Sequence, residues 1–138
     1  MAINVDLFLE VWSLFLGFVG FLIGLKGYFA PPTPPTVLVD GITYPYKADN
    51  SLEEEGIENA NVRSWGTRNA AIGLACIVAG GFLKSHDAYV LAFTMCVYRE
   101  VSDVIMLLTI EPKNVMNGVA FAIMGIVDIA ALTLALQM

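Results

Sequence analysis

The residues best suited to chemistry lie in the middle of an otherwise apolar segment, residues 88–110. Its centre carries three ionisable side chains: Arg99, Glu100 and Asp103. In a helix, Arg99 and Asp103 share a face at i, i+4, and Glu100 joins Asp103 at i, i+3. A charge at the centre of a membrane helix costs about 2.5–3.5 kcal/mol on insertion scales, so it usually faces a bundle interior or a water-filled cavity. These residues therefore either lock helices together or perform chemistry inside a membrane.

Other apolar segments contribute further ionisable groups. The complete set of candidates, two of them guanidiniums and four carboxylates, is Glu10, Arg68, Arg99, Glu100, Asp103 and Asp128. All four predicted helices supply at least one member, so the set could surround one central pocket. An ion-pair network that only fixes helix register is the alternative, although such networks add little stability over apolar packing. We favour a functional pocket, because six such groups exceed what register alone needs.

Carboxylates beside guanidiniums suit acid–base chemistry that needs no cofactor. We predict Asp103 as the base, held by Arg99, and Asp128 or Glu100 as the acid, because two carboxyl groups with separated pKa values provide a base and an acid. Arg68 would orient a carboxylate or polarise the substrate. Tyr98 adjoins the set in sequence but projects about 100° away on the helix, so it carries less weight.

Several other classes of site are excluded by residue type. His86 is the only histidine and lies in a polar turn, so there is no Ser-His-Asp set. The chain lacks an HExxH motif, a cysteine-pair metal site and a phosphate-binding glycine loop, so we predict no metal and no cofactor. Basic residues are not clustered, which excludes a nucleic-acid partner. Cys76 and Cys96 both lie in apolar segments, where we expect buried small hydrophobes and no disulfide.

The composition predicts the elements that must position these residues. Hydrophobic residues make up 57% of the 138 and charged residues only 14%, with a mean hydropathy of +0.71. Soluble domains carry about 25% charged residues, so the bilayer is the predicted solvent. The fold class is therefore all-α: a single integral membrane domain, residues 1–138, forming an up-down-up-down bundle of four transmembrane helices. We predict helices over residues 7–29, 59–83, 88–110 and 115–136.

Glycines recur along one face of the first helix. Glu10 and Ser13 precede Gly17, Gly20, Gly24 and Gly27 at steps of three and four. Small residues let a neighbouring helix approach closely in lipid, so this stripe marks the inward face. The segment has no basic region or small-residue cleavage site before it, and we expect it to be a retained helix and not a signal peptide.

A long polar loop, residues 30–58, joins the first two helices. An Asp-Gly turn within residues 37–44 predicts a short hairpin. The Ser51–Glu54 pattern matches a capping box that opens a short surface helix. We expect a folded cap and not a disordered linker. The positive-inside rule places this loop in the cytoplasm, because Lys26, Lys47, Arg63 and Lys113 lie on its side, against Lys84 alone.

Residues 66–74, GTRNAAIGL, match the pattern G-x-R-(D/N)-x-x-x-G-(L/I). This pattern is similar to the motif of a widespread family of small four-helix membrane proteins, which is known mostly as a domain of unknown function and resembles the DoxX-type bundles. In that family the motif opens the second helix, and an Asp recurs late in the third, as Asp103 does here. The family pattern is compact, so the long loop departs from it.

The resemblance implies an activity and a location. Fungal members look like tailoring enzymes of polyketide and terpenoid pathways, and some resemble the small hydrolases that open epoxides in aurovertin-like pathways. We therefore expect an enzyme that opens the epoxide of a lipophilic substrate, by hydrolysis or cyclisation. We expect it to be an integral membrane protein, of the endoplasmic reticulum if the chain is fungal. Two alternatives stay open: an isomerase or other cyclase that uses the same pocket, and a non-enzymatic lipid- or partner-binding protein. Homo-oligomerisation also stays open.

Overall fold

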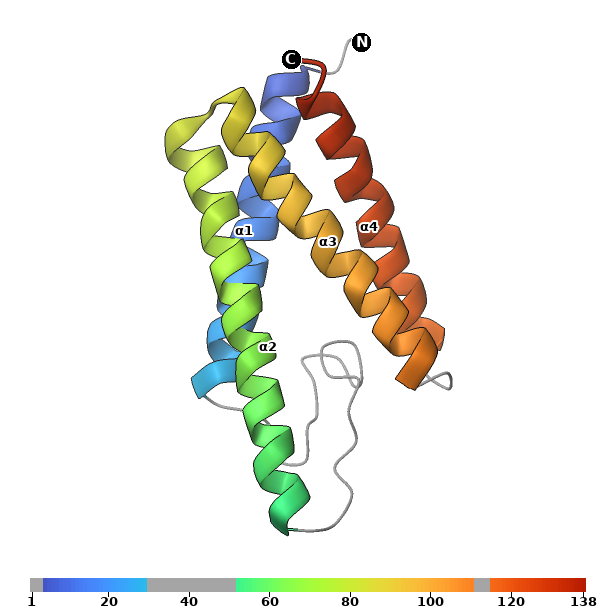
Figure 1. Cartoon of the computed structure of the whole chain (residues 1–138). Coiled ribbons are helices and arrows are strands. Elements are labelled where there is room, and N and C mark those ends of the chain that lie inside the picture. The colour runs from blue at the N-terminus through green and yellow to red at the C-terminus, as the bar shows by residue number, and fades with distance from the viewer. Residues whose placement is uncertain (1–3, 30–51, 111–114) are drawn as a thin grey trace.

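The computed structural model describes residues 4–29, 52–110 and 115–138, and the side chains of residues 4–29, 63–105 and 119–138. The described elements are helices α1 (Val5–Phe29), α2 (Leu52–Val78), α3 (His86–Ile110) and α4 (Val115–Ala135), with a π-helical turn η1 (Ala79–Leu83) continuing α2. The predicted all-α architecture with four helices is confirmed. Successive helices alternate in direction, so α1 begins, α2 ends and α4 ends at the same end of the molecule (Figure 1).

The second helix begins earlier than the sequence pattern placed it. It starts at Leu52, whereas the prediction was near Asn59. The residues expected to form a separate short surface helix are therefore the first turn of α2. The predicted hairpin at 37–44 and the predicted cap lie outside the described residues.

The described helices do not all have the apolar length of a membrane span. Val5–Phe29 and Arg63–Leu83 are long and apolar enough to cross a membrane, and Val119–Ala135 is a shorter apolar helix. By length and apolar composition, two or three of the described helices therefore qualify as spans, and the predicted bundle is confirmed only as an all-α arrangement of four helices. Helix α3 is less apolar because three charged side chains, Arg99, Glu100 and Asp103, lie within five residues of it.

Ionisable side chains lie inside the bundle and large apolar side chains lie outside it. Arg99, Glu100, Asp103 and Asp128 are all less than a tenth exposed. Large apolar side chains cover the outer faces of the helices, among them Phe15, Phe18, Leu22, Leu74, Phe82, Leu91, Ile123 and Ile126. Soluble monomers rarely expose apolar surface this extensively, and such surfaces mark membrane or protein contacts.

Helices α1 and α2 pack backbone against backbone. The glycine stripe of α1 faces inward as predicted, with Gly17, Gly20, Gly24 and Gly27 buried. Across from it, α2 and η1 present Gly66, Gly73 and Gly80 at steps of seven residues. A methyl group added to Gly73 would lie 2.7 Å from the carbonyl oxygen of Gly17. Without side chains between them, the two backbones approach closely enough to pack through van der Waals contact.

We expect Gly66→Ala to destabilise the protein by about 1–3 kcal/mol, since overpacking a tight contact forces backbone shifts. The added methyl would lie 2.7 Å from the Gly24 oxygen and 2.8 Å from the Tyr28 nitrogen, both backbone atoms. Gly81→Ala is the matched control, because its methyl meets only Leu14 Cδ2, at 3.6 Å. The measurement is the thermal unfolding midpoint in detergent. Equal midpoints for the two variants would contradict the close packing of α1 on α2.

Candidate functional site

An ion pair between Arg68 and Asp103 joins α2 to α3. Nη2 of Arg68 donates to both oxygens of Asp103, at 2.7 and 2.9 Å. The Asp103 side chain is 2% exposed and that of Arg68 is 34% exposed, so the pair has one buried and one half-buried member. Pairing with a guanidinium is what makes a buried carboxylate tolerable.

The second guanidinium does not hold Asp103. Nε of Arg99 donates to Oε1 of Glu100 at 2.8 Å, and its Nη2 reaches the same oxygen. Our prediction that Arg99 holds Asp103 at i−4 is therefore wrong: the i, i+4 spacing allowed the pair, but Arg68 from the next helix takes its place. Arg68 does orient a carboxylate, which was one of its two predicted roles.

Small residues make room for the Arg99–Glu100 pair. A methyl on Gly20 would lie 3.6 Å from Nη1 of Arg99, and one on Gly125 would lie 3.3 Å from Cβ of Glu100. The guanidinium thus lies against α1 and the glutamate against α4. Helix α3 therefore presents its charges to both neighbours at the same level of the bundle.

Asp128 is fully buried and is bound by an aromatic residue that the sequence analysis did not single out. Nε1 of Trp12 donates to Oδ1 of Asp128 at 3.0 Å and so links α1 to α4. A buried tryptophan usually needs an acceptor for its N–H, which is the signal that could have found it. Asp128 is three residues beyond Gly125, so it lies about 4.5 Å along α4 from the level of Glu100.

Glu10 does not join the other five candidates. Its Oε1 accepts from Nζ of Lys84 at 2.7 Å, and both side chains are at least one-third exposed. Lys84 has a left-handed backbone (φ 45°), which ends the π-helical turn η1. The hydrogen bond that Lys84 donates to Glu10 raises the pKa of the Lys84 amine. The pair therefore fastens α1 to the α2–α3 turn and is not part of a central pocket.

Two of the buried carboxylates keep one oxygen without a described partner. These atoms are Oε2 of Glu100 and Oδ2 of Asp128, and Nε of Arg68 is likewise unpaired among the described residues. Asp103 differs, because Arg68 binds both of its oxygens.

Tyr98 is 72% exposed and points away, as predicted. Among the described residues, no group of three or more ligating side chains could hold a metal ion.

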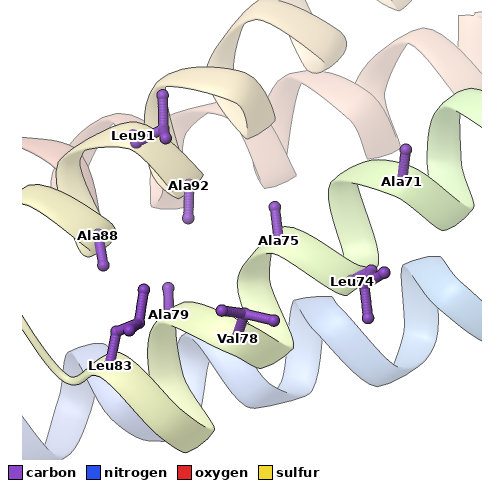
Figure 2. Close-up of a pocket in the computed structure, with 9 residues that line it drawn as sticks. All are labelled: Ala71, Leu74, Ala75, Val78, Ala79, Leu83, Ala88, Leu91 and Ala92. Atoms are coloured by element: carbon purple, nitrogen blue, oxygen red, sulfur yellow. The ribbon is translucent and has the colours of Figure 1, made fainter.

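An apolar groove lies between α2–η1 and the start of α3 (Figure 2). Its volume is about 400 Å³, and its lining residues are all alanine, leucine or valine. None of the six predicted residues lines it, so this groove is not the predicted central pocket. Its far end is Ala71, which is three residues, about one helical turn, from Arg68. A lipophilic chain lying in the groove would therefore point toward the Arg68–Asp103 pair.

Comparison of the sequence with protein-family models, curated proteins and solved structures gave no match. The resemblance carried by residues 66–74 therefore stays a prediction. What the geometry adds is that Arg68, the arginine of that pattern, bonds Asp103 directly.

We expect Asp103→Asn to destabilise the protein by about 2–3 kcal/mol, less than for a fully buried pair because Arg68 is one-third exposed. Glu10→Gln makes the same change in an exposed pair and should cost less than about 1 kcal/mol. Denaturant titration in mixed micelles measures both. Similar losses of unfolding free energy in the two variants would mean that the Arg68–Asp103 pair is as solvated as the Glu10–Lys84 pair.

Proposed function

We propose that this protein is a membrane-embedded, cofactor-independent enzyme that opens the epoxide of a lipophilic substrate by acid–base catalysis. The observation that carries the proposal is the mixed pairing of the three carboxylates. Arg68 binds both oxygens of Asp103, while Glu100 and Asp128 each keep one oxygen without a partner among the described residues. A catalytic acid and a catalytic base need different environments, because two carboxyl groups in identical environments would have similar pKa values and could not take the two roles.

Asp103 is the proposed base. Each oxygen of a carboxylate has two lone pairs, so the two bonds from Arg68 leave acceptor capacity on both atoms. In hydrolysis, Asp103 takes a proton from water while the water oxygen forms a bond to an epoxide carbon. In cyclisation, an internal hydroxyl of the substrate replaces the water. The Ala71 end of the apolar groove lies beside this pair, so the groove would hold the alkyl part of the substrate.

Asp128 is the first choice for the acid. Its only described hydrogen bond comes from the neutral indole of Trp12, whereas Glu100 is bound by the Arg99 guanidinium. The acid donates its proton to the epoxide oxygen as the C–O bond breaks. The proton that Asp103 took from water or from the substrate hydroxyl then passes to the acid and restores it. Glu100 is the second choice, and Arg99 would stabilise the charge that develops on the oxygen.

Turnover of a lipophilic epoxide in microsomes tests these roles. We expect Asp103→Asn and Asp128→Asn to lower kcat by about 10²–10⁴-fold, the usual contribution of a positioned acid or base. Asp87→Asn, at a 96% exposed side chain in the first turn of α3, is the matched control and should keep wild-type turnover. Full activity in Asp103→Asn would remove this residue from the mechanism, and a loss in Glu100→Gln alone would move the acid to Glu100.

The same groove favours a second candidate, a non-enzymatic protein that binds a lipid chain. Its nine lining residues offer no polar side chain to a reacting group. Saturable binding of a lipophilic epoxide without turnover would support this candidate. Isomerisation of a lipophilic substrate that carries no epoxide would instead indicate the isomerase alternative, since that reaction uses the same acid and base.

We further propose that all four helices cross the endoplasmic reticulum membrane with the α2–α3 turn in the lumen. The buried charges of α3 support this placement, because neighbouring helices cover them and leave apolar residues outside. Homo-oligomerisation remains a proposal, and the exposed apolar faces are compatible with it.

Cysteine labelling tests the orientation. In sealed microsomes, a membrane-impermeant maleimide should label Ser64→Cys directly and Ser85→Cys only after permeabilisation. Both positions are exposed and lie at opposite ends of the bundle, while the native Cys76 and Cys96 are fully buried and give no background. Direct labelling of Ser85→Cys but not of Ser64→Cys would show the opposite orientation.

A further inference from the structure

Two free thiols face each other across the interface between α2 and α3. Sγ of Cys76 and Sγ of Cys96 are 3.4 Å apart, and both residues are fully buried. The sequence analysis predicted their burial correctly but treated them as separate hydrophobes. They are 20 residues apart in the chain, so only the antiparallel packing of the two helices brings them together.

The backbone of α2 is fixed at this point. Oγ of Ser13, which is also fully buried, donates to the carbonyl oxygen of Cys76 at 2.7 Å. Helix α1 therefore holds Cys76 in position from the side opposite α3. A disulfide has an S–S distance of about 2.05 Å, so bond formation requires the sulfurs to approach by roughly 1.4 Å. Side-chain rotation and a small shift between two helices that meet through alanines can supply that movement.

The apolar groove runs alongside the two thiols. In Figure 2, Ala75 and Ala79 point from the α2–η1 side toward α3, and Ala92 points toward them. Cys76 follows Ala75 directly, and Cys96 is one helical turn beyond Ala92. Alanine side chains from both walls therefore line the groove close to the two cysteines, although the cysteines themselves do not line it. A lipophilic molecule in the groove would approach the thiols, whereas the apolar surroundings disfavour a water-soluble one.

We propose that Cys76 and Cys96 form a redox-active pair that a lipid hydroperoxide, entering through the groove, converts to a disulfide. One sulfur attacks the outer oxygen of the peroxide, the O–O bond breaks, and an alcohol and a sulfenic acid form. The second sulfur then displaces the sulfenic oxygen as water, and the S–S bond forms. In total, two thiols and one hydroperoxide give one disulfide, one alcohol and one water; the sulfurs are oxidised and the peroxide is reduced.

This pair does not depend on the proposed epoxide chemistry. The disulfide would tie the α1–α2 hairpin to the α3–α4 hairpin, which diverge away from the α2–α3 turn (Figure 1). It would also draw the two walls of the groove together. Oxidation would therefore narrow the groove, and dithiol reductants would reopen it.

The test uses the full chain in lipid nanodiscs after reduction and removal of the reductant. Cumene hydroperoxide, which is lipophilic, and hydrogen peroxide are compared at equal concentration. The samples are then denatured and alkylated, and their intact mass is measured. We expect cumene hydroperoxide to remove two hydrogen atoms and both alkylation sites several-fold faster than hydrogen peroxide, and dithiothreitol to restore both sites. Cys76→Ser cannot form the disulfide and should keep its remaining thiol or show a single added oxygen.

Ala75→Leu tests entry through the groove, because the larger side chain would fill it beside Cys76. Cumene hydroperoxide should oxidise this variant several-fold more slowly, while the thiol oxidant diamide still closes the disulfide and so shows that the sulfurs remain opposed. Two retained alkylation sites in the wild type after both cumene hydroperoxide and diamide would overturn the proposal. Equal rates for the two peroxides, with no effect of Ala75→Leu, would overturn the entry route.

Discussion

The structure depends on one constraint: an ionisable side chain inside an apolar bundle needs a hydrogen-bonding partner within the protein. Arg68 and Asp103 meet this constraint across α2 and α3, and Trp12 and Asp128 meet it across α1 and α4. Removing one member leaves an uncompensated polar group, which is far more costly than never having buried the pair. These contacts therefore restrict the relative positions of the helices more strongly than alkyl packing could.

Close packing of α1 on α2 makes the charged contacts geometrically possible. Because Gly20 has no side chain, the guanidinium of Arg99 can lie against α1 while α1 remains packed on Gly73 of α2. Apolar packing alone gives little orientation in lipid, where the solvent is as apolar as the side chains. Glycine contacts set how close the helices come, and the polar contacts select their register.

The sequence predicted the helices, the inward glycine face and the four buried ionisable residues more reliably than it predicted which side chains pair with one another. Helical period places Arg99 and Asp103 on one face, but it carries no information on residues from other helices. Arg68 therefore displaced Arg99 as the partner of Asp103 only once α2 and α3 were docked. The prediction that Glu10 lines a central pocket was wrong for a related reason. Glu10 lies on the glycine face as predicted, but it binds Lys84 of the neighbouring turn at the end of the bundle.

The unequal pairing of the carboxylates argues against a network that serves register alone. A purely structural network gains by satisfying every buried acceptor, and an unpaired one costs about 1–3 kcal/mol. Glu100 and Asp128 each leave an oxygen without a described partner, although Arg99 lies within electrostatic range of both. Replacing both members of each contact with apolar residues of similar size would avoid that cost. Their retention is understandable if the free oxygens take a proton, a water molecule or a substrate oxygen.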